Sequence, residues 1–165
     1  MPGALQGFRI IDVTQVISGP LATRILADQG ADVIKVEPPS GDILRHMGGI
    51  NGLSPTFTTT NRSKRSVVLD LKDEDGLALL RDMVAGADVF IQNSRPGIAE
   101  RMGIGEKELR AINTAGNYGK HKGFVDERNG SVKQASCLSV PYLRRRQWTR
   151  GERTDDGEST IEFEL

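Results

Sequence analysis

The sequence predicts an α/β fold built on a doubly wound, mostly parallel sheet, and three observations indicate it. Short apolar segments rich in β-branched residues alternate along the chain with segments whose apolar residues have helical spacing. Glycine and proline mark the joints between them, which are short. The 165 residues fit one domain of ordinary size. Strands that alternate with helices in this way favour a parallel sheet with helices on both faces.

The first strand is predicted at residues 8–13, an apolar and β-branched segment that follows Gly7. A helix comes next, with Pro20 suited to its first turn and Gly30 to its end. The second strand is predicted at 31–37 and is ended by two prolines, which cannot donate to a strand ladder. Together these elements predict a right-handed βαβ unit. The side chains expected in its core are Ile10, Ile11, Val13, Leu26, Val33, Ile34 and Val36.

Residues 40–61 are rich in glycine and are predicted as a long loop with room for one helical turn. Long loops inside compact domains tend to be functional. The pattern then predicts, in order, a strand at 66–71, a helix at 73–84, a strand at 87–92 and two short helices at 96–102 and 106–112.

The character of the chain changes after residue 113. Glycines there lie among scattered charges, and neither helical nor strand periodicity continues. We therefore expect residues 1–113 to form the folded part and residues 114–165 to form a divergent, poorly ordered tail. Within that tail only residues 136–143 are apolar enough for a strand.

The composition excludes several kinds of partner and site. Lys plus Arg and Asp plus Glu each number 22, so no overall charge draws the chain to nucleic acid or to an anionic membrane. The basic run at 144–146 lies among acidic residues and is more typical of a solvated segment than of a nucleic-acid or membrane patch. His46 and His121 lie far apart without further ligands at metal-binding spacing, so no metal site is predicted.

The same composition indicates a cytoplasmic protein. The single cysteine, Cys137, excludes an internal disulfide and is typical of a reducing compartment. No apolar segment approaches the roughly 18 residues that a membrane-spanning helix needs, and the first residues lack the order of a signal peptide.

Two groups of residues are candidates for a ligand site. Residues 15–20 join the first strand to the first helix, at the edge of a doubly wound sheet where ligands bind, and helix-start amides there could hold an anion. An ordinary βα turn is the alternative interpretation. Cations at 62–65 precede the third strand, and Asn93, Ser94, Arg95 and then Arg101 follow the fourth. We expect both sets near strand ends, where a phosphorylated ligand would meet them, although isolated cation clusters are usually solvated.

The usual nucleotide motifs are missing from the sequence. It has no Gly-x-x-x-x-Gly-Lys-Ser/Thr loop, and the run that begins at Gly103 lacks the last glycine of a dinucleotide fingerprint. An NAD-binding module is therefore disfavoured.

A longer set of motifs resembles class III CoA-transferases, the group that includes formyl-CoA, L-carnitine and bile-acid CoA-transferases and α-methylacyl-CoA racemase. The matching segments, in order, are 5–7, 12–16, 18–20, 26–39, 41–42, 61–66, 69–72, 87–89 and 95–97. They extend over residues 5–113, about two-thirds of the chain. The resemblance implies a Rossmann-like large domain, here incomplete, and a smaller second domain. It also implies two full-length chains interlocked as a homodimer, an arrangement not expected of this chain.

The resemblance also implies a ligand, coenzyme A bound as acyl-CoA, and a carboxylic acid as the second substrate, with no metal. Gln15 and Val16 are expected to line the thioester pocket, and Leu69 and Lys72 to lie near the adenine. The residues expected to help hold CoA are Asn93, Ser94, Arg101 and Met102. Ser94 stands where many members have Phe, and Pro38 where some have a basic residue.

In such transferases an aspartate downstream of Asn113 attacks the thioester. Here Asn113 is followed by Thr114 rather than by the proline of the family's Asn-Pro pair, so no catalytic residue is assigned, and Asp126, Asp155 and Asp156 are not taken as replacements. We expect a truncated or frameshifted chain without turnover. The alternatives are a non-catalytic CoA-binding fragment and the acyl-CoA racemase branch of the same family.

Overall fold

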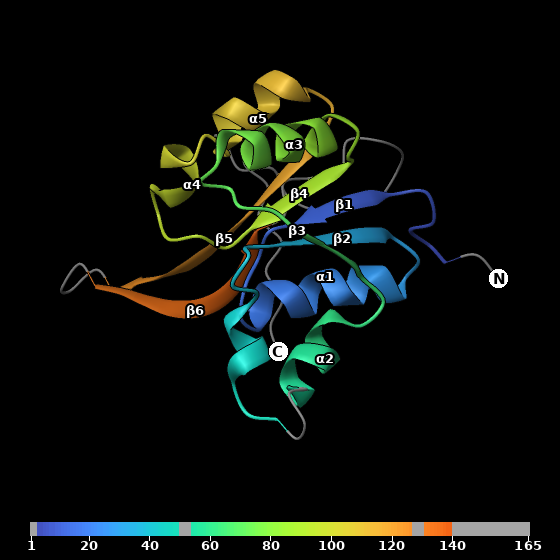
Figure 1. Ribbon diagram of the computed structural model, residues 1–165, viewed down its shortest axis with the longest axis vertical. Coiled ribbons are helices and arrows are strands. Elements are labelled where there is room, and N and C mark those ends of the chain that lie inside the picture. The colour runs from blue at the N-terminus through green and yellow to red at the C-terminus, as the bar shows by residue number, and fades with distance from the viewer. Residues whose placement is uncertain (1–2, 50–53, 127–130, 140–165) are drawn as a thin grey trace, which may run out of the picture.

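A computed structural model of the chain describes residues 3–49, 54–126 and 131–139 (Figure 1). Its centre is a six-stranded sheet in the order β3-β2-β1-β4-β5-β6. The strands are β1 (Arg9–Asp12), β2 (Asp32–Glu37), β3 (Arg65–Val68), β4 (Val89–Gln92), β5 (Asn117–Asp126) and β6 (Ser131–Ser139). The first five are parallel to one another, and β6 is antiparallel to β5. The predicted α/β fold with a mostly parallel sheet is therefore confirmed.

Helices cover both faces of the sheet. They are α1 (Ser18–Asp28), the 3-10 helix η1 (Ile43–His46), α2 (Pro55–Asn61), α3 (Glu74–Ala85), α4 (Ile98–Arg101) and α5 (Glu106–Ile112). In Figure 1, α1 and α2 lie below the sheet, and α3 and α5 lie above it. Successive strand residues point to opposite faces of the sheet, so a strand contributes side chains to two hydrophobic cores, one on each face. Ile10 belongs to the core on the α1 side, and its neighbour Ile11 belongs to the core that contains Leu80 of α3.

The predicted βαβ unit is present as β1, α1 and β2, with β1 and β2 parallel and Ile10 opposite Val33. None of the seven side chains expected in its core is exposed. Four are buried, namely Ile10, Ile11, Val33 and Val36, and the other three are partly buried against the cores. Apolar, β-branched runs beside glycine or proline were thus sufficient to locate the two strands of this unit.

The prediction of one long loop at 40–61 is wrong, because η1 and α2 both lie in this segment. Asp42 caps η1 by accepting a hydrogen bond from the Leu44 amide at 3.0 Å. Ser54 caps α2 in the same way, with the Phe57 amide 3.3 Å from its Oγ, and Pro55 occupies the first turn. A capping serine followed by proline is a helix-start signal that the glycine content of the segment obscured.

β5, which continues the sheet past residue 113, was not predicted from the sequence. Residues Asn117 to Lys120 pair with β4, and the Tyr118 ring stacks on Phe90 with 5.6 Å between centroids. This strand is polar and glycine-containing, so its partner strand rather than its own composition specifies it. The strand predicted at 136–143 overlaps β6, and its residues 140–143 lie outside the described residues. The separate character of residues 114–165 stays a prediction. No helix within the described ranges is long and apolar enough to cross a membrane.

Candidate functional site

Two loops meet at the carboxyl edge of the sheet, where β1 and β4 end. The Asn93 side chain accepts a hydrogen bond from the Gln15 amide at 3.0 Å and donates one to the Gln15 carbonyl oxygen at 2.8 Å. Next to it, the Ser94 amide donates to Gln92 Oε1 at 2.6 Å. The structure therefore brings together predicted site residues from two loops: Gln15 follows β1, and Asn93 and Ser94 follow β4. The Gln15 side chain is exposed, so it points away from this fixed backbone.

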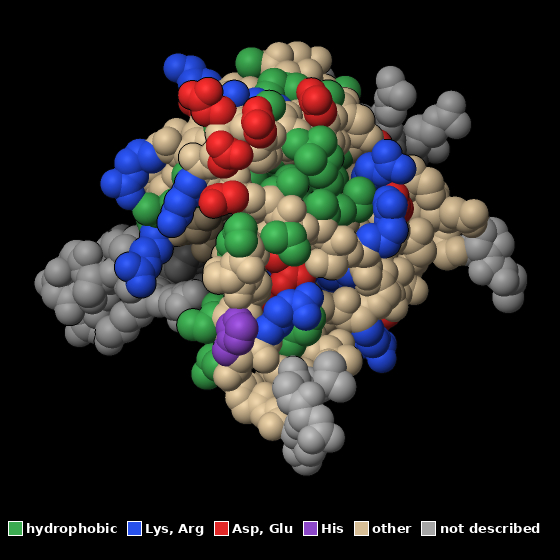
Figure 2. Space-filling model, in the orientation of Figure 1, with side chains coloured by type: hydrophobic (Ala, Val, Ile, Leu, Met, Phe, Trp, Pro, Cys, Tyr) green, Lys and Arg blue, Asp and Glu red, His purple; other side chains and the backbone are tan. Residues whose placement is uncertain are grey.

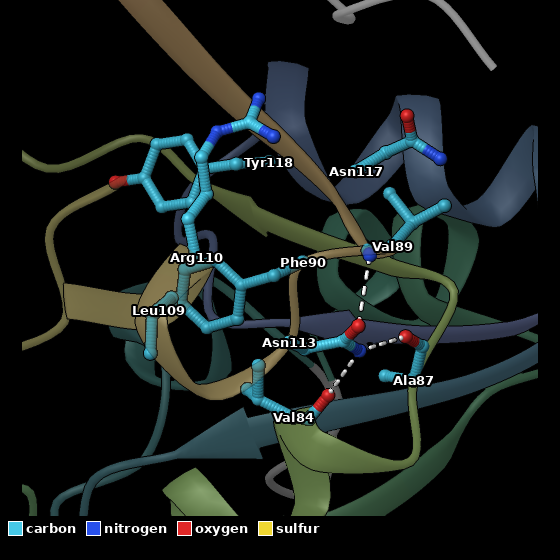
Figure 3. A pocket seen from close by; sticks show the side chains of 10 residues that line it. Val84, Ala87, Val89, Phe90, Leu109, Arg110, Asn113, Asn117 and Tyr118 are labelled. Atoms are coloured by element: carbon cyan, nitrogen blue, oxygen red, sulfur yellow. Dashed lines mark hydrogen bonds between the residues drawn. The ribbon is translucent and has the colours of Figure 1, made fainter. Parts of the chain in front are cut away.

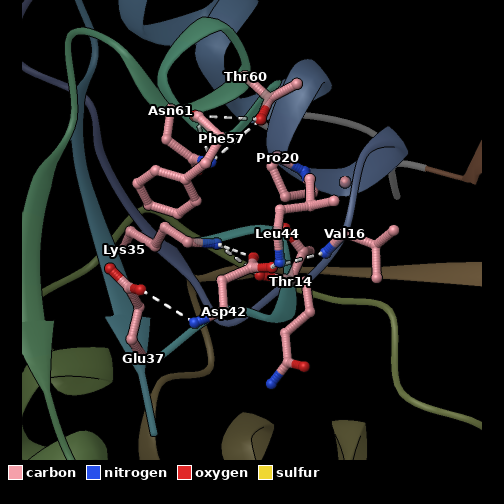
Figure 4. Close-up of polar contacts among 12 residues, drawn as sticks. Thr14, Val16, Pro20, Lys35, Glu37, Asp42, Leu44, Phe57, Thr60 and Asn61 are labelled. Carbon is pink, nitrogen blue, oxygen red and sulfur yellow. Dashed lines mark hydrogen bonds and ion pairs between the residues drawn. The ribbon is translucent and has the colours of Figure 1, made fainter. Parts of the chain in front are cut away.

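Val16 has an unusual backbone conformation. Its φ of 71° lies in the left-handed region, which a β-branched side chain rarely adopts. Such outliers persist only where their surroundings enforce them, and they gather at functional sites. The Val16 amide faces Asp42, whose Oδ1 lies 3.4 Å from the amide nitrogen (Figure 4).

A buried ion pair lies beneath this loop. Lys35 Nζ is 3.1 Å from Asp42 Oδ2, and both side chains are at most 2% exposed. The same Nζ donates to the Thr14 carbonyl oxygen at 2.8 Å, as Figure 4 shows. Neither Lys35 nor Asp42 was predicted to have a role. A lysine inside an apolar strand was the available signal, because a buried lysine requires a partner.

A second buried ion pair joins Lys64 Nζ to Asp12 Oδ2 at 2.9 Å. Asp12 also accepts a hydrogen bond from Thr23 Oγ1 at 2.6 Å and one from the Thr14 amide at 2.9 Å. Burial would raise the pKa of Asp12, but Lys64, Lys35 and the threonine hydroxyls outweigh it and lower that pKa. Burial lowers the pKa of Lys64, although Asp12 opposes the effect. This pair links β1 to the start of β3.

A third ion pair, between Arg45 and Glu37, lies at the end of β2. Arg45 holds Glu37 with two bonds of 2.6 and 2.7 Å, and Ser66 donates to the same carboxylate at 2.8 Å. Burial would raise the pKa of Glu37, yet the bonds from Arg45, Ser66 and the Asp42 amide lower it to about 2. The Arg45 guanidinium also lies 3.8 Å from the centre of the Phe57 ring, which ties η1 to α2.

The cations at 62–65, predicted near a strand end where a phosphorylated ligand would meet them, are each paired with an aspartate in the structure. Arg62 pairs with Asp28 at 2.8 Å, Arg65 pairs with Asp32 at 2.7 Å, and Lys64 is buried against Asp12. These cations precede β3, so they begin at its amino end, whereas ligands of parallel sheets bind at carboxyl ends. Their ion pairs with Asp28, Asp12 and Asp32 stabilise the fold.

The remaining predicted site residues follow the carboxyl ends of β3 and β4 in the chain. Leu69 is buried in the core and its amide donates to the Glu37 carbonyl oxygen at 2.9 Å, whereas Lys72 is exposed in the next turn. Arg101 is exposed at the end of α4, and Met102 packs partly against the core. Figure 1 places α4 on the side to which β1 and β4 point, and Figure 2 shows basic side chains on that side.

A shallow pocket lies at the opposite edge of the sheet, where β4 and β5 begin (Figure 3). Asn113 reaches across it and donates to the carbonyl oxygens of Val84 at 2.9 Å and Ala87 at 2.8 Å. Its own side-chain oxygen accepts from the Gly116 amide at 2.8 Å. These bonds satisfy backbone polar groups at the end of α3 and in the turn before β5. We therefore assign Asn113 a role in stabilising the fold rather than in binding a ligand. Within the described residues no group of His, Cys, Asp or Glu could hold a metal ion.

Comparison with known proteins gives several matches. A profile of CoA-transferase family III matches residues 5–138. The chain is 42% identical over 130 residues to a formyl-CoA:oxalate CoA-transferase of Streptomyces avermitilis, covering 76% of this chain and 31% of the relative. It is 42% identical over 148 residues to a succinyl-CoA:mesaconate CoA-transferase of Haloarcula hispanica, covering 86% of this chain and 37% of the relative. The chain thus spans about a third of the length of these relatives.

Solved structures match the fold as well. The crystal structure of a CAIB/BAIF family protein from Brucella suis is 36% identical, with a TM-score of 0.71 over 75% of this chain and 34% of that one. The crystal structure of a hypothetical protein from Mycobacterium tuberculosis is 32% identical, with a TM-score of 0.71 over 98% of this chain and 44% of that one. The predicted resemblance is confirmed, and the profile extends beyond residue 113, where the resemblance was predicted to end.

Proposed function

This chain belongs to CoA-transferase family III, and on that basis we propose that the carboxyl edge of its sheet binds the CoA part of an acyl-CoA thioester. The observation that carries the proposal is the reciprocal pair of hydrogen bonds between Asn93 and the Gln15 backbone. These bonds fix two loops beside each other at the edge where doubly wound sheets bind ligands. They leave the Gln15 side chain exposed toward an incoming ligand.

Each part of CoA has a proposed partner along this edge. Gln15 and Val16 face the thioester, and Asn93 and Ser94 hold the pantetheine side. Lys72 and the backbone of Leu69 lie toward the adenine, since the Leu69 side chain is in the core. Arg101 is exposed and has no ion pair within the described part of the chain, so it suits a phosphate, while Met102 supports its position.

We propose transfer of CoA to a carboxylic acid rather than racemisation. The relatives named above are transferases, and their named acceptors, oxalate and mesaconate, are both dicarboxylic acids. A dicarboxylic acid is therefore the proposed acceptor of the whole protein. The interlocked homodimer and the cytoplasmic location stay predictions for that protein.

CoA is expected to raise the melting temperature of the chain, and Arg101→Ala is expected to reduce that shift. A charged hydrogen bond to phosphate contributes about 1.5 to 3 kcal/mol to binding, so the affinity should fall by about tenfold or more. The measurement is thermal unfolding across a CoA titration. Arg9→Ala is the matched control, because Arg9 begins β1 at the opposite edge and should leave the shift unchanged. No CoA-dependent shift at millimolar CoA would refute the proposed site.

We further propose that the chain by itself binds CoA without transferring it. The carboxylates that bond to the 14–16 loop or to its supports, namely Asp12, Glu37 and Asp42, are all buried and ion-paired. A carboxylate nucleophile needs free access to the thioester, so none of these three suits that role. Purified chain mixed with formyl-CoA or succinyl-CoA and oxalate should give no product by mass spectrometry. Transfer that disappears on mutation of a single aspartate would contradict this.

A further inference from the structure

We infer that Asp42 is a positioning residue of the proposed CoA site, because it holds Val16 in its left-handed conformation and thereby fixes the Gln15–Val16 loop. The inference rests on the proposed function. It concerns a residue that touches the loop and not the ligand: the Asp42 side chain is fully buried.

The backbone of this loop is held entirely by side chains. The Thr14 amide donates to Asp12 at 2.9 Å, and the Thr14 carbonyl oxygen accepts from Lys35 at 2.8 Å. Both backbone polar groups of Gln15 bond to Asn93. The Val16 amide, the last in this series, bonds to Asp42. Every polar backbone group from the Thr14 amide to the Val16 amide therefore has a partner, and four separate segments of the chain supply these partners.

Asp42 differs from the other three partners because it bonds to the strained residue. Valine at φ 71° has lower-energy conformations available, and the chain would adopt them unless a specific contact opposed the change. Asp42 provides that contact, and its own position is fixed by the Leu44 amide at 3.0 Å and by Lys35 at 3.1 Å (Figure 4). A change in φ at Val16 would turn the adjacent Gln15 side chain away from its present direction.

Asp42 could instead act only as the counter-ion of Lys35, and the single variant Asp42→Ala does not separate this role from the hydrogen bond to Val16. Removing one partner of a buried ion pair leaves an uncompensated charge, so Asp42→Ala alone would destabilise the chain in both cases. Lys35→Met removes the charge with little change in volume. In that background, Asp42→Asn keeps an acceptor oxygen for the Val16 amide and Asp42→Ala does not. The pair K35M/D42N and K35M/D42A thus separates the hydrogen bonds of Asp42 to the Val16 and Leu44 amides from its charge, and exchange at Val16 reports on the first of these bonds.

The experiment compares the two double variants of the 165-residue chain by CoA titration and by amide hydrogen exchange. We expect K35M/D42A to bind CoA at least about tenfold more weakly than K35M/D42N, and its Val16 amide to exchange at least about tenfold faster. Leu80→Ala, which removes a buried side chain on the opposite face of the sheet, controls for lost stability and should change neither readout.

Equal CoA affinities of the two double variants would overturn the inference, as would equal exchange rates at Val16. If K35M/D42A fails to fold, the wild-type chain decides: its Val16 amide should exchange at least about tenfold more slowly than the Ile17 amide, which has no bond within the described residues. Equal rates at these two amides would also overturn it. If the wild-type chain does not bind CoA, the proposed function fails, whereas the exchange data still report whether Asp42 holds Val16.

Discussion

Lys64→Met is expected to lower the free energy of unfolding by about 3 to 5 kcal/mol, because it leaves the Asp12 carboxylate buried without its closest cation. Lys64 and Asp12 side chains are 1% and 0% exposed, so water cannot replace the lost partner. Lys64 also donates to the Pro20 carbonyl oxygen and to Asn61 Oδ1, each at 2.8 Å. Its removal therefore frees polar groups of α1 and α2 as well. Urea unfolding at pH 7 measures the change.

Two further variants distinguish this explanation from a general effect of losing a lysine. Asp12→Asn combined with Lys64→Met removes both buried charges and should recover part of the lost stability. Arg62→Met breaks the neighbouring ion pair with Asp28, in which the Arg62 side chain is 56% exposed. Arg62→Met should lower the free energy of unfolding by less than about 1 kcal/mol, since exposed ion pairs contribute little to stability. A double variant no more stable than Lys64→Met alone would contradict the buried-charge explanation.

The parallel sheet was predictable because its signals are local. β-branched runs such as 8–13, which follows Gly7, and 31–37, which lies between Gly30 and Pro38, indicate strand positions from local sequence alone. β5 carried no such signal, since its hydrogen bonds come from β4 and its tyrosine packs on Phe90. A strand specified mainly by its neighbour cannot be recognised from its own residues.

The candidate site was predictable only in part, for a related reason. The chain order places Gln15 and Asn93 after strands, and parallel strands bring their carboxyl ends to one edge, so their proximity follows from the topology. The roles of Lys35 and Asp42 depend on which charges pair in the core, and sequence spacing does not determine that. For the same reason the cations at 62–65 looked like ligand groups, whereas each is paired with an aspartate far away in the sequence.

Acid is expected to destabilise the chain strongly through Glu37. The pKa of this carboxyl is lowered from 4.5 to about 2 in the folded chain, mainly because the bonds from Arg45 and Ser66 outweigh burial. A lowered folded-state pKa adds stability that is fully present above the unfolded pKa and is lost as the pH falls toward the folded pKa. Here the loss runs from about pH 5 down to about pH 2. A pKa shift of this size corresponds to about 3 kcal/mol in the free energy of unfolding. The Glu37 side chain is only 2% exposed, so solvent screens this contribution little.

Glu37→Gln tests this assignment, because glutamine keeps the shape but cannot form the ion pair with Arg45. Asp12 and Asp32, whose pKa values are also lowered, remain in the variant and in the wild type alike. The difference between the two stability curves therefore isolates Glu37. Urea unfolding at pH 7, 5, 4 and 3 should show the variant less stable at pH 7 and the two curves converging as the pH falls. Curves that stay parallel over this range would show that Glu37 is not the group that acid titrates.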